Sequence, residues 1–332
     1  MERRKSKKHQ LLQTIQSRCE LAQIERQELD RLEKGFQGEL RMDQMVNEFL
    51  TGEIVVIDDL TLKYKGSLVQ IDKIIIAGNT LYLIDMKNYR GNYILQNNNW
   101  YCGDKLLTAN ILEQLRRAVR LLIQLLQENQ LYLKVVGVLA FVGLDGTVVV
   151  KDSVSEIILQ YGDISRWLYR LNQEQTYLKY PNCEMIIRNY QVDPYSCEYR
   201  VEMADLTKGI CCPKCHEIGM KEHWYKLSCS CGYTQAKLVG YLRTISEYGV
   251  IFADKDLSRK DLRLFFGEGV NDDYLRRVLI KYFELKSKAA RASSYVNKGI
   301  LFEYLFENQR ELFVKINQRA GWKEPRSSKY EI

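Results

Sequence analysis

The stretch that decides the fold is KGSLVQIDKIIIAGNTLYLIDMKNYRGN, which spans residues 65–92. It contains two apolar runs, residues 68–77 and 80–88, joined by Gly78 and Asn79. A glycine–asparagine pair between such runs predicts a two-residue hairpin turn, because glycine readily adopts the positive φ that the turn requires. We therefore expect two antiparallel strands in which residues equally distant from the turn face each other.

This register places two acids, Asp72 and Asp85, directly opposite each other and Gln70 opposite Lys87. Because side chains alternate along a strand, Asp85 and Lys87 share one face. Two carboxylates across a ladder lie ~5 Å apart and repel each other, so an otherwise apolar hairpin that carries them needs a cation between them. A hard divalent ion with oxygen ligands fits this need, and Lys87 adds a positive charge nearby. The alternative is a polar edge that faces solvent on a half-buried hairpin.

A third acid, Glu39, falls on the apolar face of a helix predicted at residues 35–50. Met42, Val46 and Phe49 define that face, and Glu39 lies one helical turn before Met42. A carboxylate on a buried face is costly unless it is paired or binds a ligand, which makes Glu39 a candidate member of the same cluster. The alternative is that Glu39 lies at the end of the stripe, near the helix N-terminus, where acids are favourable in any case.

Four separated motifs occur in the order Gly38-Glu39, Gln70-Ile71-Asp72, IDMKNY at residues 84–89, and Gly91. Together they resemble the PD-(D/E)XK nuclease superfamily and, more narrowly, the nuclease-related domain (NERD) of bacterial proteins. The resemblance covers residues 35–146 and departs from the superfamily at Asp85, where Glu is common. It implies an α/β, nuclease-like fold in which a mixed sheet is flanked by helices.

The resemblance also implies roles for individual residues. Asp72 and Asp85, with Glu39 directly or through water, would bind Mg²⁺ or Mn²⁺. Lys87 would position or deprotonate water, or stabilise the charge that develops on phosphorus. Gln70 would orient substrate or solvent. In the family a glutamine on the helix predicted here at residues 110–127 reaches the active centre, and Gln114 occupies that place; the alternative is ordinary helix surface.

A second motif consists of two short-spaced cysteine pairs, Cys212 with Cys215 and Cys229 with Cys231. Each pair lies in a tight turn with Pro or Gly, and four thiolates so arranged can bind one tetrahedral Zn²⁺. We therefore expect a zinc ribbon with a closed, structural site. Neighbouring residues that offer substitute ligands are Cys211, His216 and His223. The alternatives are a redox-active pair and a reduced loop without metal.

The chain after the ribbon is expected to be helical and basic. One helix is predicted at Arg259–Phe266 and a second after Asn271, across a glycine-containing turn, which matches the outline of a helix-turn-helix. Residues 276–298 contain seven Lys or Arg and one acid. Three basic side chains project away from the apolar face of the second helix, where they could contact phosphates: Arg276, Arg277 and Lys281. The alternative is a solvated basic face.

The composition limits the classes of protein to which the chain can belong. The chain has 332 residues, 46% hydrophobic and 27% charged, which suits two or three soluble domains. A net charge of +7 suits a polyanionic partner. No signal peptide is visible, and the longest apolar run, residues 135–144, is too short to cross a bilayer as a helix. Nine cysteines without a secretory signal indicate a reducing compartment, so we expect a cytoplasmic protein that binds no membrane.

The predicted organisation has five segments. They are a basic tail and helix at 1–34, the nuclease-like core at 35–150, a connector at 151–205, the zinc ribbon at 206–240 and a small basic helical region at 241–322. Three local elements are also predicted: an N-terminal helix patterned between Leu12 and Leu29, a strand near residues 185–190, and one final helix at 299–321.

The function predicted from these features is divalent-metal-dependent hydrolysis of nucleic-acid phosphodiester bonds, with DNA favoured over RNA as partner. One alternative is a catalytically silent nucleic-acid-binding module of the same fold. A second alternative is a protein-interaction or regulatory adaptor. The sequence does not determine the oligomeric state.

Overall fold

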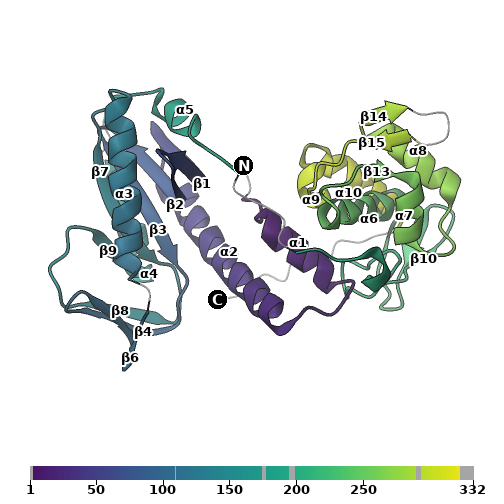
Figure 1. Ribbon diagram of the computed structural model, residues 1–332, viewed down its shortest axis with the longest axis horizontal. Coiled ribbons are helices and arrows are strands. Elements are labelled where there is room, and N and C mark those ends of the chain that lie inside the picture. The colour runs from purple at the N-terminus through teal and green to yellow at the C-terminus, as the bar shows by residue number, and fades with distance from the viewer. Residues whose placement is uncertain (1–2, 109, 174–176, 194–198, 289–292, 322–332) are drawn as a thin grey trace. The chain divides into compact units, whose positions relative to one another are not determined.

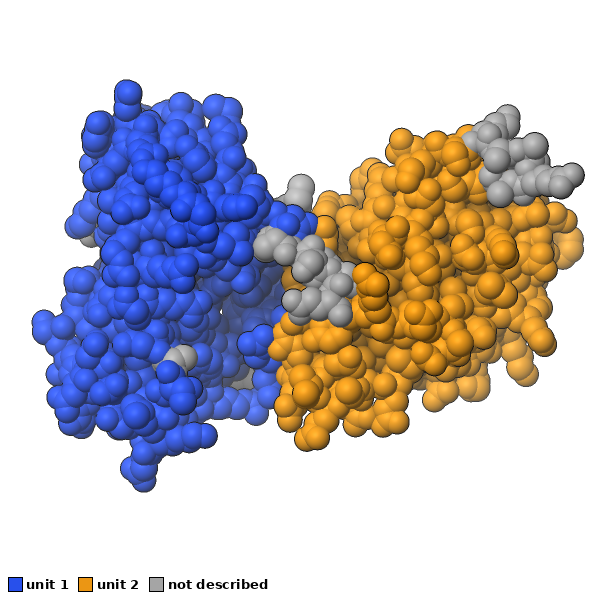
Figure 2. Space-filling view, viewed as in Figure 1, with its two compact units in different colours: residues 1–3, 30–194 blue, residues 4–29, 195–332 orange. Residues whose placement is uncertain are grey.

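The computed structural model describes residues 3–108, 110–173, 177–193, 199–288 and 293–321. The chain divides into two compact units, which Figure 2 distinguishes by colour. Unit 1 comprises residues 1–3 and 30–194, and unit 2 comprises residues 4–29 and 195–332. The division into five segments stays a prediction.

The core of unit 1 is a five-stranded mixed sheet. Its strands, in spatial order, are β1 (Ile54–Tyr64), β2 (Ser67–Ala77), β3 (Thr80–Lys87), β7 (Lys134–Phe141) and β9 (Ile157–Leu159). The first three strands are antiparallel neighbours, whereas β3, β7 and β9 run parallel to one another. Helices cover both faces of the sheet, which is why the run KIIIA in β2 reads as continuously apolar apart from its lysine. The predicted α/β fold with a mixed sheet flanked by helices is confirmed.

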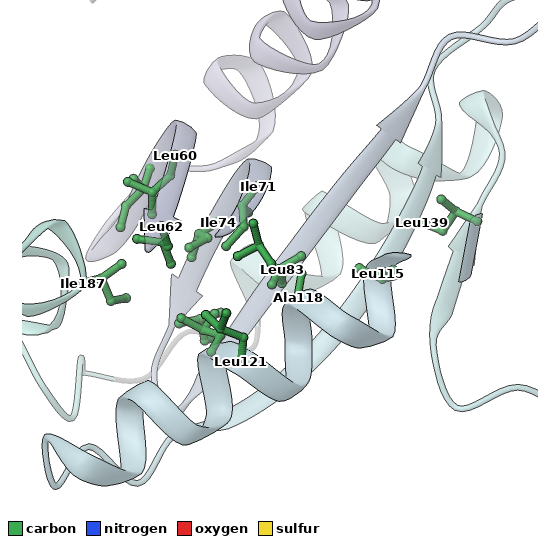
Figure 3. Packing of buried hydrophobic residues seen from close by; sticks show 14 of the residues in the cluster. Leu60, Leu62, Ile71, Ile74, Leu83, Leu115, Ala118, Leu121, Leu139 and Ile187 are labelled. Carbon is green, nitrogen blue, oxygen red and sulfur yellow. The ribbon is translucent and has the colours of Figure 1, made fainter. Parts of the chain in front are cut away.

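One face of this sheet packs against α3 (Ile111–Glu128), which Figure 1 shows lying along the strands. Asn110 caps α3 by accepting a hydrogen bond from the N–H of Glu113. Figure 3 shows Ala118 of α3 beside Leu83 of β3, in the cluster that also contains Leu115, Leu121 and Ile74.

The other face packs against two helices. Met42 and Val46 of α2 (Gln23–Phe49) and Ile164 and Leu168 of α4 (Tyr161–Gln173) form a second core with strand residues such as Ile84. Only the part of α2 from Asp30 onwards belongs to unit 1. The odd and even positions of β3 therefore face different helices, as the alternation of side chains requires.

A smaller four-stranded sheet extends unit 1. It contains, in spatial order, β6 (Lys105–Leu106), β5 (Asn99–Cys102), β4 (Gly91–Gln96) and β8 (Gly146–Val150). Tyr93 of β4 and Trp100 of β5 pack against Phe141 at the end of β7. The small sheet is thereby joined to the end of the main sheet where Lys87 lies.

Unit 2 is built around a buried helix, α6 (Lys237–Ile251), against which α1 (Lys7–Gln16) packs. The ribbon sheet precedes α6 and contains β10 (Lys221–Glu222), β11 (Lys226–Ser228) and β12 (Thr234–Ala236). The elements after α6 are β13 (Leu257–Ser258), α7 (Arg259–Phe266), α8 (Asp272–Tyr282), β14 (Leu285–Lys288) and β15 (Ser293–Tyr295). Two short helices complete the unit, α9 (Phe302–Leu305) and α10 (Arg310–Arg319).

Three predicted elements differ from the structure. The strand expected near residues 185–190 is the helix α5 (Cys183–Arg188), because Cys183 and Ile187, one turn apart, are both buried. The final helix is split into α9, a 3₁₀ turn at Glu307–Gln309 and α10.

The N-terminal helix is the third correction. It is interrupted between Gln16 and Gln23, and α2 then runs without a break through Gly35, where a new helix was expected. The interruption is held by Arg18, whose buried guanidinium donates to the carbonyl oxygens of Thr207 (3.1 Å) and Gly209 (3.2 Å) and pairs with Glu247. Such long-range contacts leave no periodic signal in the sequence.

None of the described helices combines the length and the apolar composition needed to cross a membrane.

Candidate active site

The predicted hairpin forms with the predicted register, although its ladder stops short of the acids. Gly78 has φ 57°, and the pairs from Ala77–Thr80 to Lys73–Ile84 are as expected. At the next position the backbones no longer pair. Instead, Oδ2 of Asp72 accepts a hydrogen bond from the N–H of Met86 at 2.7 Å. The two acids thus lie where β2 and β3 separate, while β3 continues to pair with β7 as far as Lys87.

The backbone around Asp72 is distorted. Val69 and Ile71 lie in the same hydrophobic cluster as Ile74, which a regular two-residue alternation along β2 would not allow. Opposite Asp72 on β1 lies Asp59, whose φ of 47° falls in the left-handed region that aspartate tolerates better than most residues. The neighbouring positions of β1 and β2 remain paired, so the irregularity is confined to this point.

Asp85 and Lys87 form the closest charged contact of the site. The Lys87 Nζ lies 2.9 Å from each carboxylate oxygen of Asp85, and the two side chains are 14% and 12% exposed. The ammonium donates its hydrogen bond to Oδ1. Among the described residues, none donates a well-directed hydrogen bond to Oδ2, which is buried. A buried carboxylate oxygen therefore keeps a lone pair available for a cation.

Burial raises the pKa of both acids, and the charge of Asp85 adds to the rise at Asp72. Burial, followed by the charge of Asp85, raises the pKa of Asp72 from 3.8 to about 7, against the opposing effects of the Met86 N–H and Lys87. Burial also raises the pKa of Asp85, although Lys87 acts in the opposite direction. For Lys87, burial alone would lower the pKa, but the carboxylates of Asp85 and Asp72 raise it. One ammonium is therefore not enough to keep both acids ionised, and the pair fits a divalent cation.

Glu39 lies apart from this pair. Its Oε2 is 3.2 Å from Nη1 of Arg3, and burial raises the pKa of its carboxyl despite that guanidinium. The charge of Glu39 nevertheless raises the pKa of Asp72, so the two acids are electrostatically linked. Of the described residues, only four cysteines bring three or more metal-binding atoms within 4.8 Å of one another, and Glu39 therefore forms no such cluster with Asp72 and Asp85.

A buried ion cluster beside the site was not predicted. The side chain of Lys73, 1% exposed, lies between Asp43, at 2.7 Å, and Asp58. Arg3 bridges the same two acids, at 2.7 and 3.1 Å. These ion pairs fasten α2 to β1 and β2. Two features of the sequence could have indicated this cluster: a lysine inside the apolar run KIIIA, and an acid one helical turn after Glu39.

The remaining predicted site residues are more exposed. Gln70 donates to Oδ1 of Asp59 at 3.4 Å, and the β2–β3 ladder ends before it could pair with Lys87. Gln114 is exposed near the start of α3. Gly38 allows close approach as expected, since a Cβ there would lie 2.8 Å from the Cβ of Asn88.

Residues 34–142 match the family model of the nuclease-related domain. These residues form a nuclease-related domain. No curated protein and no solved structure matches the chain. All six residues predicted for the catalytic site lie inside the NERD segment: Glu39, Gln70, Asp72, Asp85, Lys87 and Gln114.

Outside the nuclease-related domain, the four predicted cysteines come together in unit 2. The Sγ atoms of Cys212, Cys215, Cys229 and Cys231 all lie within 4.8 Å of one another, with separations of 3.8 Å for Cys212–Cys231 and 3.5 Å for Cys215–Cys229. A tetrahedral Zn²⁺ with Zn–S bonds of ~2.3 Å places its sulfur ligands ~3.8 Å apart. The backbone N–H of Cys231 lowers the pKa of Cys229 to about 6, whereas burial raises the pKa of Cys212. The cluster could hold zinc, in agreement with the predicted ribbon.

The three predicted nucleic-acid-binding residues, Arg276, Arg277 and Lys281, are exposed on α8. The opposite face of this helix buries Leu275, Val278 and Leu279. Asn271 caps α8 by accepting a hydrogen bond from the N–H of Tyr274 at 2.9 Å. The basic side chains are thus available to solvent, as the sequence pattern indicated.

Proposed function

We propose that the nuclease-related domain hydrolyses phosphodiester bonds of nucleic acid with Mg²⁺ or Mn²⁺ held by Asp72 and Asp85. The observation that carries this proposal is a pair of buried, mutually repelling carboxylates with an ammonium beside one of them and a carboxylate oxygen without a directed donor. Carboxylate oxygens are the ligands that both ions prefer.

Each residue has a distinct part in this proposal. When bound, the divalent ion supplies Lewis-acid polarisation of the scissile phosphate and lowers the pKa of a water. Lys87, oriented by its hydrogen bond to Asp85, stabilises negative charge that develops on phosphorus, or positions the attacking water. Glu39 contributes through water, since Arg3 already pairs with its carboxylate. Gln70 and Gln114 orient substrate or solvent at the edge of the site.

The proposed partner is nucleic acid, with DNA favoured over RNA, and the proposed location is the cytoplasm. Arg276, Arg277 and Lys281 of unit 2 contact phosphates, which makes binding depend strongly on salt. The four cysteines bind one Zn²⁺, which stabilises the fold of the ribbon and takes no part in catalysis.

A metal titration tests the proposed activity. The purified full chain is incubated with single- and double-stranded DNA and RNA while Mg²⁺ or Mn²⁺ is varied. Cleavage should require the ion and should be lost in Asp85→Ala but not in Asp104→Ala, which removes an exposed acid from the same unit. Cleavage that survives Asp85→Ala would assign the activity to a contaminating nuclease or to another site.

A second candidate function is nucleic-acid binding without turnover. The ion pair between Arg3 and Glu39 favours it, because a carboxylate occupied by a guanidinium is a poor ligand for a metal. This candidate predicts that the full chain retains nucleic acid at low salt but cleaves none of it at any concentration of either ion.

A further inference from the structure

A basic groove of about 1380 Å³ is hollowed into unit 2 between α7, α8 and the hairpin formed by β14 and β15. Its charged lining consists of Lys208, Arg259, Lys260, Arg263, Arg276 and one acid, Glu268. All five basic side chains are exposed. A concave surface with such an excess of positive charge concentrates polyanions.

The elements around the groove follow one another as helix, turn and helix, with a hairpin attached. The turn between α7 and α8 begins at Gly267, which has φ 76°, and ends at the cap Asn271. The chain then returns through β14 and β15, and β15 also pairs with β13, the strand that leads into α7. The segment that carries Lys208 is fixed against α7, because the Gly209 N–H donates to the carbonyl oxygen of Phe265 at 3.0 Å.

Two arginines of α7 lie near the first turn of α8. The Nε atoms of Arg259 and Arg263 lie 3.6 and 3.8 Å from Oδ1 of Asp272, while their side chains remain 49% and 58% exposed. Surface ion pairs at these distances contribute little stability, and neither guanidinium group forms a hydrogen bond with this oxygen of Asp272. Each guanidinium group has further N–H groups that do not contact Asp272 and that can donate hydrogen bonds to a phosphate.

We propose that unit 2 binds double-stranded DNA, with the exposed face of α8 in the major groove and the arginines of α7 on the flanking phosphates. An α-helix with its side chains is ~10–12 Å across, and the major groove of B-form DNA is ~12 Å wide. The exposed face of α8 carries Arg276, Arg277 and Lys281, which can donate to phosphates and to guanine edges. Two apolar side chains of the groove, Leu264 and Ile280, are 52% and 58% exposed, and Ile280, one turn after Arg276, can contact thymine methyl groups.

The same features argue against other nucleic acids. The major groove of A-form RNA is deep and narrow and does not admit a helix. Single-stranded nucleic acid is held by bases stacked on aromatic side chains. Among the described residues that line the groove, the aromatic side chain is Tyr295, which is 6% exposed and cannot act as a stacking platform.

This inference rests on the nucleic-acid binding proposed above for unit 2 and specifies its ligand, and it does not require a divalent ion. It is tested by fluorescence anisotropy with the full, zinc-loaded chain in buffer without added Mg²⁺ or Mn²⁺. The probes are a labelled 20-base-pair DNA duplex, an RNA duplex of the same sequence and the single DNA strand. The variants are Arg263→Ala/Arg276→Ala, the charge-conserving Arg263→Lys/Arg276→Lys, and Lys315→Ala, which removes an exposed lysine of α10 outside the groove.

The DNA duplex should bind more tightly than either other probe. The double alanine variant should weaken its binding by about 30-fold and reduce the slope of log K against log [salt] by about 1, since the phosphate contact of Arg263 is lost while Arg276 reads base edges in the major groove. The double lysine variant should keep the slope, and Lys315→Ala should bind as the wild type does. Thermal melting verifies that each variant is folded. If the double alanine variant does not fold, the double lysine variant is used for the test instead.

Three results would overturn the inference. One is equal or tighter binding of the RNA duplex or the single strand. Another is unchanged DNA binding in the double alanine variant. The third is displacement of the DNA by a polyglutamate peptide of equal charge, which would identify the groove as a docking site for acidic protein. Since none of these assays measures cleavage, the proposed activity of Asp72 and Asp85 stands or fails separately.

Discussion

Replacing Asp72 by Asn should stabilise the protein while removing its activity. In the structure this carboxyl accepts a hydrogen bond from the Met86 N–H, and the charge of Asp85 and burial oppose its ionisation. Asparagine has nearly the same shape and keeps an oxygen for Met86, but it carries no charge and is a weaker metal ligand. The substitution therefore removes the repulsion without opening a cavity.

The size and the pH dependence of the effect follow from the pKa of Asp72. Because the pKa rises from 3.8 in its ordinary state to about 7 in the fold, the folded protein binds more protons than the unfolded chain between these values. The free energy of unfolding must then fall as pH rises from 4 to 7, by at most about 4 kcal/mol from this group. Asp72→Asn should thus stabilise the metal-free protein by about 1–4 kcal/mol at pH 8 and have little effect near pH 3.

Urea unfolding followed by tryptophan fluorescence measures this difference. Trp100 and Trp167 belong to unit 1, and Trp100 is 1% exposed, whereas Trp224 of unit 2 is 94% exposed. Among the tryptophans that the structure describes, the change in fluorescence therefore reports mainly on unit 1. Asp104→Asn, at an exposed position, is the matched control. If Asp72→Asn destabilised the protein at pH 8, or changed its stability equally at both pH values, the two acids would not repel each other and the argument for a bound cation would fail.

Three further predictions concern other parts of the molecule. Lys87→Ala should lower single-turnover cleavage by about 100-fold or more while Mn²⁺ binding persists; loss of Mn²⁺ binding would show that the lysine acts through the metal site. Gly38→Ala should destabilise the protein by about 1–3 kcal/mol in urea unfolding, because its Cβ would lie 2.8 Å from that of Asn88. Gly35→Ala, whose Cβ meets nothing within 4 Å, should instead stabilise it by about 1 kcal/mol, and equal effects would contradict the packing. Cys215→Ser should lose one equivalent of zinc by elemental analysis and melt at a lower temperature; a full zinc content would refute the ribbon site.

The parts of the fold that the sequence predicted are those set by local chemistry. The glycine turn at Gly78 defined the hairpin and its register, and the cap at Asn271 marked the start of α8. The cysteine spacing likewise predicted a cluster that forms within 4.8 Å. Each of these signals lies within a few residues of the feature that it determines.

The parts that the sequence missed depend on distant contacts. The interruption of the N-terminal helix is held by Arg18, which bonds to residues nearly 200 positions away. The splitting of β2 and β3 at Asp72 accompanies the left-handed backbone of Asp59 on a third strand. The ion pair of Arg3 with Glu39 joins the first residues of the chain to α2. No periodicity or motif in the sequence encodes these contacts, so only the three-dimensional structure reveals them.

The central claim is that Asp72 and Asp85 hold a divalent cation between them, and its most direct measurement is the anomalous scattering of a crystal grown or soaked with Mn²⁺. The account predicts a peak ~2.1 Å from a carboxylate oxygen of each acid, with Lys87 still adjacent. A crystal that contains Mn²⁺ elsewhere but shows no peak between these two carboxylates would contradict it.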